Sequence, residues 1–517
     1  MIINAATDII KSVGDPSAEF ESLAPLWKKS RALCSGERYV KSFDAVVDTR
    51  NFKNLLIPFS PSMTQVQYNF YKAEAELPGV TAQYAKMLVG GLLRKQPALT
   101  FSAAVPAEAM SWISDEFGAD STSLMAFLDV ALWEEIQTSR AWVFVDYPET
   151  VEGDETAYRP YPIVHSAETV INVRTREVNG ESKIDRVILR GFTESYVDEN
   201  GGELWHPRYI DTVWVHELVD NLYQIRKFVL KAPVSQVPVL AGQVVKTPEK
   251  NKQVFTLEDT KLVLVNGKRI SMIPGWPLNG QAVAPEPMLM SIIDKELSLY
   301  NKLSRRNHLL YGAATYTPII SSDMSDEAFQ EIVDSGLGTW IKLRQGDVAD
   351  ILKTPTEALD DMQTAIVAGF EELAKLGVRM LSPENVQSGI ALEIRNASQT
   401  AQLGSLNSKI SAIMRQIILF MINWRYNLEL TLDNIQFSLS ADFDPVPLGA
   451  EWLRLATEWY QQGLIPRSVW LNILKINDMV PPEYNDVEGR NEIQSDMDLT
   501  MKASEDYAKS LSATAPQ

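Results

Sequence analysis

The stretch "SKISAIMRQIILFMINW", residues 408–424, is the most apolar part of the chain and limits what the fold can be. A helix that crosses a bilayer needs roughly 20 consecutive apolar residues. Here the unbroken apolar run covers only 417–422, and charged side chains stand on both sides of it, at Lys409, Arg415 and Arg425. The stretch therefore predicts a buried helix and not a membrane span.

The composition narrows the class of protein. With 517 residues the chain is longer than one hydrophobic core usually organises, so we expect several subdomains. The single cysteine, Cys34, excludes an intramolecular disulfide and cysteine-based metal clusters, as expected of a protein made in a reducing cytoplasm. The N-terminal residues show no secretory signal pattern. The net charge of −19 argues against a protein that grips nucleic acid or anionic membranes.

The first part of the chain, to about residue 137, has the periodicity of helices. Apolar residues recur at three- and four-residue spacing over 80–92 and again over 124–136, which places them on one face of a helix. Ser121 or Thr122 is expected to cap the second of these helices, because hydroxyl side chains accept hydrogen bonds from the free N–H groups of the first turn.

Between about 138 and 275 the period changes to two, which predicts strands. Three turn signals separate the strand pairs, at Asn179-Gly180, Asn200-Gly201-Gly202 and Asn266-Gly267. Asn-Gly between alternating apolar residues is the strongest short-range signal of a β-hairpin. The fold class predicted from the sequence is therefore α+β, with long helices and an antiparallel β region.

The second half returns to helices. Pro287 suits the first position of a helix whose apolar face carries Leu289, Ile293, Leu297 and Tyr300. Strand-like segments follow within 311–357, around a small helix, at 314–322 and 338–347. The next helix is expected to have one apolar face and to end at Gly377; that face comprises Met362, Ile366, Phe370 and Leu373. A loop of roughly 15–20 residues then precedes the apolar helix, and loops of that length are usually functional.

The search for catalytic chemistry finds no phosphate-binding glycine loop, no metalloprotease helix and no nucleophile elbow. His216 lies on one face of a predicted strand, where a structural histidine is favoured over a catalytic one. Asp442 and Asp444 could form a metal pair, although a solvated strand end is favoured. The cluster of Lys302 with Arg305 and Arg306 either complements the negative end of a helix dipole or faces a phosphate backbone.

The order of these elements, together with several local stretches, resembles the portal proteins of tailed bacteriophages. The stretches that carry the resemblance are "SRALCSGERYVKSF" (30–43), "QYNFYKAEAELPGVTAQYAKMLVGGLLRKQPAL" (67–99), "YPIVHSAETVINVR" (161–174), "GVRMLSPE" (377–384), "IALEIRNASQTAQLGSLNSKI" (390–410) and "ADFDPVPLGAEWLRLATEWYQQGLIPRSVWLNIL" (441–474). One departure is Val173, where the family pattern has an aromatic residue.

The resemblance implies a portal architecture with wing, stem, clip and crown regions. Mapped on this chain, the regions are a wing at 1–286 (helical over 1–137, β-rich over 138–275), a stem helix at 287–310, a clip at 311–357, a second stem helix at 358–377, a tunnel loop at 378–396, a long helix at 397–427, a wing strand at 428–447 and a crown at 448–517 with a disordered tail. The apolar helix at 408–424 would then be covered by its own wing and by neighbouring subunits.

The function implied by the resemblance is a ring of twelve subunits at one capsid vertex, without catalysis and without a cofactor. Such a ring contacts the major capsid protein, docks the terminase large subunit and head–tail adaptor proteins, and passes double-stranded DNA that it binds weakly. It is made in the host bacterial cytoplasm and resides in the virion. The residues expected to face the DNA channel are Lys302, Arg305, Arg306, Arg379 and Arg395.

Two other classes of function remain open on the sequence. One is a different virion connector or a scaffold-like ring, which would lack the stem–clip–stem order. The other is a cytoplasmic enzyme that uses carboxylates in a β cleft, for which the sequence supplies no recognised motif.

Overall fold

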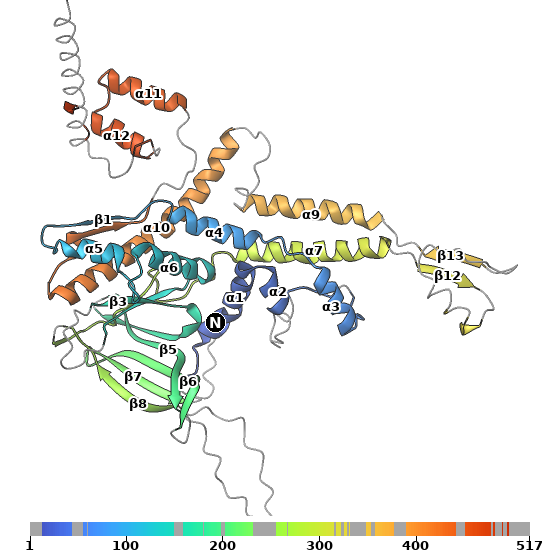
Figure 1. Cartoon of the computed structure of the whole chain (residues 1–517), viewed down its shortest axis with the longest axis horizontal. Helices are drawn as coiled ribbons and strands as arrows, with labels where there is room; N and C mark the ends of the chain where they lie inside the picture. The colour runs from blue at the N-terminus through green and yellow to red at the C-terminus, as the bar shows by residue number, and fades with distance from the viewer. Residues whose placement is uncertain are drawn as a thin grey trace, which may run out of the picture. The chain divides into compact units, whose positions relative to one another are not determined.

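A computed structural model of the chain combines helices with antiparallel strands (Figure 1), which confirms the α+β prediction. It describes residues 13–43, 55–148, 159–230, 255–314, 317–321, 325–327, 330, 348–352, 357–376, 389–440, 450–476, 479–480, 489 and 494–495, apart from gaps at 59, 179, 198–201 and 266. The chain divides into two compact units, Met1–Ala441 and Asp442–Gln517.

The N-terminal part of the first unit is helical, as predicted. Its helices are α1 (Ala18–Ser35), α2 (Glu37–Phe43), α3 (Gln65–Glu74), α4 (Val80–Leu92), α5 (Glu108–Asp115) and α6 (Leu124–Thr138). The prediction that Ser121 or Thr122 caps α6 is wrong, because the N-cap is Ser123, whose hydroxyl accepts from the N–H of Ala126 at 3.3 Å. Ser123 has the extended backbone that an N-cap needs, whereas Ser121 has a φ of 55°.

The β region is an antiparallel meander in the order β4-β5-β6-β7-β8. Its strands are β4 (Val170–Val178), β5 (Glu181–Val197), β6 (Glu203–Val219), β7 (Leu222–Leu230) and β8 (Phe255–Leu262). Gly180 turns between β4 and β5 with a φ of 81°, and Gly267 turns between β9 (Leu264–Val265) and β10 (Lys268–Arg269) with a φ of 76°. Both are predicted turns. The turn predicted at 200–202 lies almost entirely outside the described residues.

Two smaller sheets of the first unit lie apart from this meander in the pairing order. One has the order β11-β2-β3, from β11 (Gly275–Pro277), β2 (Trp142–Asp146) and β3 (Tyr161–His165), which is followed by the short η1 (Ala167–Thr169). The other pairs β1 (Ala98–Phe101) with β14 (Ile435–Ser438), next to η3 (Leu432–Asn434). A Cβ on Gly275 would lie 2.4 Å from the Phe144 ring, so only glycine permits this approach of β11 to β2.

The C-terminal part of the first unit contains α7 (Met290–Ala314), β12 (Thr317–Ser321), β13 (Val348–Leu352), α9 (Glu357–Lys375) and α10 (Gly389–Tyr426). β12 pairs with β13 in antiparallel register. The first strand predicted in 311–357 matches β12. The second, at 338–347, lies outside the described residues. β13 follows it directly.

Helix α10 starts earlier than the sequence predicted. Residues 389–396 were expected to belong to the loop at 378–396, but they form the first two turns of α10. The composition of small and polar residues suggested a loop, yet the segment after Gly389 contains no further glycine and no proline, and Ala, Leu, Glu and Arg all favour helix. Residues 377–388 lie outside the described part.

The opening stretch, 408–424, is buried by its own chain. Ile417, Ile418, Met421 and Ile422 are all 0% exposed in the single chain, beside β14, β11 and α4. The expectation that the helix is covered by its own wing is therefore confirmed, and the expected cover by neighbouring subunits stays a prediction. Among the described residues, no helix is long and apolar enough to cross a membrane.

The second unit contributes α11 (Ala450–Gln461) and α12 (Arg467–Ile476). The rings of Tyr460 and Trp470 stack at 4.7 Å between centroids and hold the two helices together. Gly463, with a φ of 72°, turns the chain between them. The disordered tail predicted at the C-terminus falls outside the described residues.

Candidate functional site in the α7 and α9 helix pair

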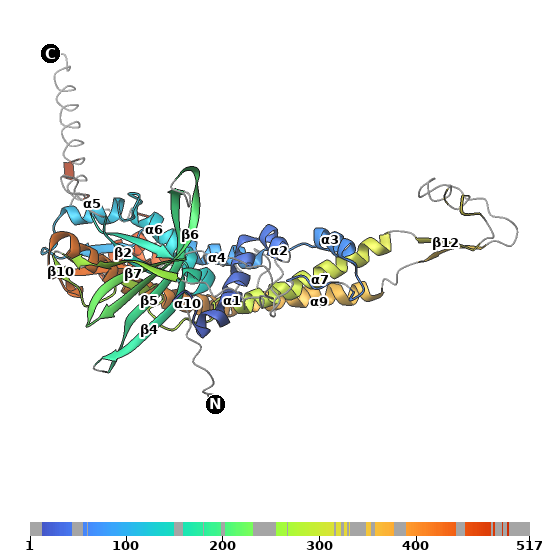
Figure 2. The ribbon, with the colours of Figure 1, turned by 90° about the horizontal axis from the view of Figure 1, so that it is seen from below.

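Helices α7 and α9 lie side by side in opposite directions, as both views of the ribbon show (Figures 1 and 2). The predicted apolar face of α7 is buried, and Ile293 and Tyr300 are 0% exposed. The facing residues on α9 are Ile366 and Leu373. A Cβ on Gly369 would lie 2.5 Å from Leu299 Cδ2, so this glycine allows the two helices to approach closely.

Polar contacts fix the register of the pair. Lys295 forms an ion pair with Glu372, and one turn beyond Leu299 the Lys302 ammonium lies 3.4 Å from the carbonyl oxygen of Ala365. Each step forward along α7 therefore matches a step backward along α9, at about 1.5 Å per residue. Continuing this register places Arg306 at the level of Asp361.

A buried carboxylate attaches α7 to the helical part of the chain. Glu296 is 0% exposed and accepts the backbone N–H groups of Val80 at 2.9 Å and Thr81 at 2.7 Å. These are the first residues of α4, whose N-cap is Gly79 and supplies no side chain. The N-terminal end of a helix is electropositive and carries free N–H groups, so it stabilises a carboxylate. Glu296 thus fixes α7 against α4.

Two further contacts attach α7 to N-terminal segments on another side than Glu296. Lys29 of α1 lies 2.5 Å from Asp294. The Asn301 side chain donates to the carbonyl of Leu55 at 2.9 Å and accepts the N–H of Ile57 at 2.6 Å. Since residues two apart in a helix point in nearly opposite directions, N-terminal segments contact α7 on two sides, and α9 packs between them.

The predicted channel residues of α7 lie in the middle of the helix. We expected α7 to end near residue 310, so that Lys302, Arg305 and Arg306 would complement its C-terminal dipole. The helix continues to Ala314 and has no basic residue in its last turn, so the dipole interpretation is wrong. Four of the six residues after His308 are good helix formers, and they extend the helix despite Gly312; they are Leu309, Leu310, Ala313 and Ala314.

These three basic side chains are half-buried. Arg305 lies close to Tyr71 of α3: burial raises the pKa of the Tyr71 hydroxyl, and the Arg305 charge partly opposes this. Of the other two predicted channel residues, Arg379 lies outside the described part. Arg395 is in the first turns of α10 and not in a loop. The described structure therefore groups three of the five predicted residues on one helix.

Two apolar side chains of α9 remain exposed. Phe370, which the sequence placed on the apolar face of this helix, is 41% exposed, and Val367, three residues earlier, is 47% exposed. Phe370 misses the helix contact because Gly369, one position earlier, is the residue that meets α7. On α3, Val66 and Phe70 are 64% and 68% exposed. Large exposed side chains of this kind are common at interaction surfaces, and the sequence search did not single them out.

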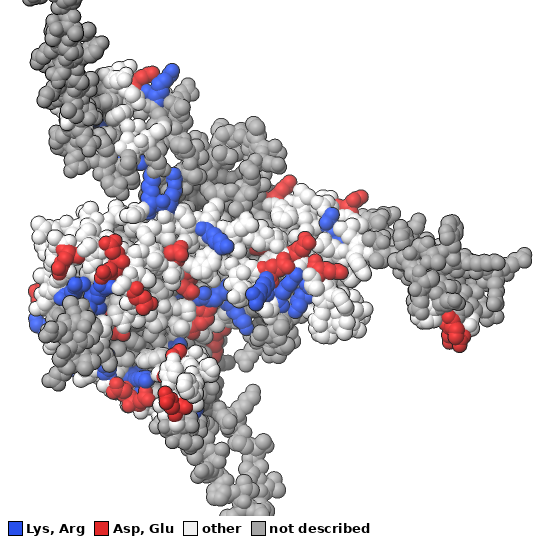
Figure 3. Space-filling view, in the orientation of Figure 1, with Lys and Arg blue, Asp and Glu red and all other residues white. Residues whose placement is uncertain are grey.

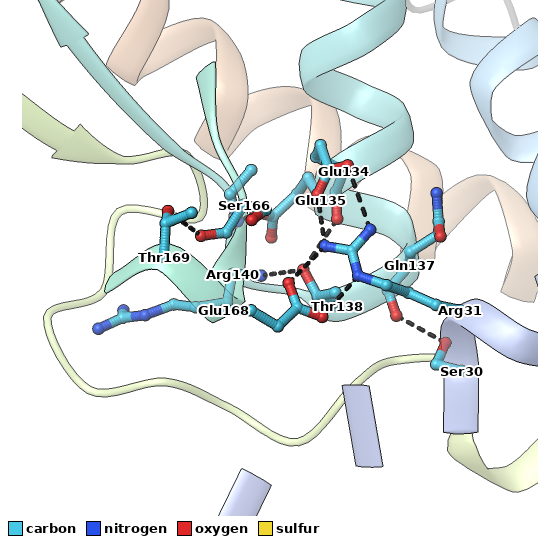
Figure 4. A network of polar contacts seen from close by, with 11 residues as sticks. Ser30, Arg31, Glu134, Glu135, Gln137, Thr138, Arg140, Ser166, Glu168 and Thr169 are labelled. Atoms are coloured by element: carbon cyan, nitrogen blue, oxygen red, sulfur yellow. Dashed lines mark hydrogen bonds and ion pairs between the residues drawn. The ribbon is translucent and has the colours of Figure 1, made fainter. Parts of the chain in front are cut away.

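A polar network joins α1, α6 and η1 (Figure 4). Arg31 lies 2.6 Å from both Glu134 and Glu168. Burial alone would lower the pKa of the Arg31 guanidinium, but the two carboxylates outweigh burial and raise it. Ser30 donates to the carbonyl of Gln137 at 2.6 Å. The network locks the helices to the β region and accounts for these charges structurally.

Glu135, in the same region, has the perturbed acidity expected of a catalytic carboxylate. Burial raises its pKa to about 7, partly offset by the Ala141 N–H at 2.9 Å and by Arg140. Burial lowers the pKa of Arg140 to about 10, and its guanidinium donates to the carbonyls of Gln281 and Ala282. Glu135 is 2% exposed, so a substrate cannot reach it in this structure.

The other candidates for chemistry have structural partners or lie outside the described residues. His216 Nδ1 lies 2.7 Å from the Tyr223 hydroxyl within the β region. Asp442 and Asp444 are outside the described part. Within that part, no group of three His, Cys, Asp or Glu side chains could hold a metal ion.

Comparison with known proteins gives a match to a family model and likenesses to solved structures. Residues 288–425 match a family model described as "Domain of unknown function (DUF4055)", a segment that extends from the start of α7 to the end of α10. Comparison with curated proteins gives no match. Among solved structures, the chain is similar to one described as "Neck of native GTA particle computed with C12 symmetry", with 10% identity and a TM-score of 0.37, over 76% of this chain and 89% of that chain. A likeness of this extent does not assign a function.

Proposed function

We propose that the chain is the subunit of a portal-type ring at one vertex of a phage capsid, through which DNA is packaged and ejected. The observation that carries the proposal is the unit from α7 to α10. It consists of two antiparallel helices, a small β12–β13 sheet in the connection between them, and the 38-residue helix α10. This is the stem–clip–stem–helix order that the sequence resemblance implies. The separate family match over 288–425 covers the same unit.

The packing of α7 supports a structural role for the helix pair, as a rigid element of the ring. Glu296, Asn301 and the Lys29–Asp294 pair attach α7 to the N-terminal segments on two sides, so that the helix cannot rotate independently. The exposed Val367 and Phe370 of α9 are free to contact the adjacent helix pair when copies are arranged around an axis. A ring needs such a heterologous contact between two different faces of the same chain.

The charge distribution supports a conduit that does not grip DNA. In the view of Figure 3, Lys and Arg side chains are mixed with Asp and Glu among the coloured residues and do not form one continuous basic surface. With a net charge of −19 per subunit, a ring would repel a duplex except at local basic positions. Lys302, Arg305 and Arg306 on α7, with Arg379 and Arg395, are our choice for the residues that centre the duplex.

This function implies further partners. A ring of twelve subunits would contact the major capsid protein, dock the terminase large subunit and head–tail adaptors through the segment 311–357, and reside in the virion. It would have no catalytic site. Another virion connector or scaffold ring would lack the helical waist formed by the helix pair. An enzyme would show activity as an isolated monomer.

Negative-stain microscopy and mass photometry of the purified full chain test the proposal. We expect rings with a central hole and a mass near twelve subunits, formed over a range of salt and protein concentrations. A monomer under every condition would refute the ring. Filter binding of duplex DNA to closed rings then tests the conduit. We expect weak binding, and a tight complex with a steep salt dependence would contradict the sliding mechanism.

A further inference from the structure

The hairpin of β5 and β6 extends beyond the rest of its sheet. β4 pairs with β5 only as far as Leu189, and β7 pairs with β6 only from Thr212 onward. Among the described residues, Phe192–Val197 and Glu203–Asp211 therefore pair only with each other. We call this two-stranded segment the ribbon, and Figure 2 shows it beside the label β6. A two-stranded ribbon is only marginally stable in water without a covered face.

One face of the ribbon carries large aromatic side chains. Phe192, Glu194 and Tyr196 are on the same face of β5 because side chains alternate between the two faces of a strand. Tyr209 of β6 pairs with Glu194 and therefore lies on this face too. Phe192, Tyr196 and Tyr209 are 68%, 53% and 62% exposed. Trp205 lies at the outer end of the ribbon, within the register shift between the pairs Ser195–Arg208 and Val197–Glu203, and is 96% exposed. Tyrosine and tryptophan are enriched among the residues that contribute most of the binding energy at interfaces. This exposed aromatic surface is therefore typical of a surface that packs against another segment.

The same face of the sheet is covered at the base of the ribbon. There Ile188, Val213 and Val215 form a buried cluster, against which Val13, Phe20 and Phe255 pack. The Arg190 guanidinium donates to the carbonyl of Gly14 at 3.2 Å and pairs with Asp211 at 2.5 Å. Val13, where the description of the chain begins, thus packs on the base of this face. The aromatic side chains at the outer end of the same face are exposed.

We propose that residues 1–12 cover the aromatic face of the ribbon. These residues directly precede Val13 and read MIINAATDIIKS. Ile2, Ala6, Ile9 and Val13 recur at three- and four-residue spacing, with Ile3 and Ile10 beside them, which gives the segment one apolar stripe and one polar side. The stripe continues the apolar character of Val13 outward onto the ribbon.

The dimensions agree with this assignment. The part of β5 beyond Leu189 contains eight residues, which is about 27 Å of strand. A segment of twelve residues spans about 18 Å as a helix and up to about 40 Å when extended. It can therefore reach the aromatic residues from Val13 without moving the base of the sheet. The inference does not depend on the proposed function.

Fluorescence of Trp205 in the full chain tests the proposal. The chain has 12 tryptophans, so the Trp205 signal is obtained as the difference between each protein and its W205F variant. The full chain is compared with a deletion of residues 2–12, which keeps Val13 and the buried cluster. We expect Trp205 to be several-fold less accessible to acrylamide in the full chain, and its emission to shift to longer wavelength in the deletion.

A pair of substitutions provides a version of the test that does not remove the segment. Ile3→Asp with Ile10→Asp places charges on the apolar stripe and should expose Trp205 as the deletion does. Asn4→Asp, on the polar side with Asp8 and Lys11, is the matched control and should leave Trp205 protected. Protection that depends on protein concentration, and is lost in the deletion, also supports the proposal, with the segment then covering a second copy. Equal accessibility with and without the segment, whether high or low, overturns it.

Discussion

Replacing Glu135 by glutamine should change how the stability of the protein depends on pH. Burial of the Glu135 carboxyl, 2% exposed at the end of α6, raises its pKa from the ordinary 4.5 to about 7. A difference of this size corresponds to about 3 kcal/mol, at about 1.4 kcal/mol per pH unit. Because the folded pKa lies above the unfolded one, the folded protein holds the proton more tightly. The associated stability is complete below pH 4.5 and is lost as the pH rises through 7.

Glutamine keeps the size of the side chain, and its oxygen can still accept the N–H of Ala141. It adds an amide donor in a buried place, which costs about 1 kcal/mol if it finds no partner. The Glu135→Gln variant should therefore be about 1 kcal/mol less stable than the native protein at pH 4.5. At pH 8 it should be about 2 kcal/mol more stable, since the native protein then carries the full cost of a buried charge.

Urea denaturation of both proteins between pH 4.5 and pH 8.5, followed by circular dichroism, measures this difference. Glu429→Gln, at an exposed position, is the control for removing a carboxylate elsewhere on the surface. The free energies of unfolding of the native protein and Glu135→Gln should cross within this range. If the two curves stay parallel from pH 4.5 to pH 8.5, the reasoning about burial of Glu135 is refuted.

Two further predictions concern the helix pair. Gly369→Val places side-chain atoms where Leu299 already lies and should lower the free energy of unfolding by about 1–3 kcal/mol. Gly404→Ala on α10 is the control, because a Cβ there meets nothing within 4 Å, and it should be neutral or stabilising. Thermal denaturation of both variants measures the difference. Lys302→Glu with Arg306→Glu should weaken duplex binding further and reduce its salt slope by about two, if both side chains contact phosphate. Arg454→Glu, in the second unit, is the control, and an equal loss of binding there would contradict a local role for α7.

Much of the local structure follows from the sequence because it depends on short-range geometry. The apolar stripe of α7 and the glycines of two β-turns are readable from spacing and backbone preference alone. The turn between β6 and β7 is not, since Asp220 and Asn221 adopt φ values of 51° and 61° without a glycine. Their left-handed backbone is recognisable only once the two strands are seen to pair in that register.

The candidate site was only partly predictable for the same reason. The sequence indicates two amphipathic helices and a basic cluster at Lys302, but it does not show where α7 ends. It also cannot show that Phe370 would be displaced from the helix contact by Gly369, since that depends on how closely Leu299 approaches. The exposure of a side chain is a property of what packs against it.

Periodicity and turn chemistry thus determined the α+β class, the antiparallel meander and the buried state of the stretch 408–424 before any contact was known. The tertiary structure alone decided that Glu296 serves as the cap of α4, more than 200 residues earlier in the chain, and that a single chain encloses the apolar helix. Local patterns arise from the repeat of the backbone. Contacts between residues far apart in the sequence depend on which surfaces of the helices and sheets pack together. A carboxylate or an apolar stripe in the sequence does not specify the element against which it will pack.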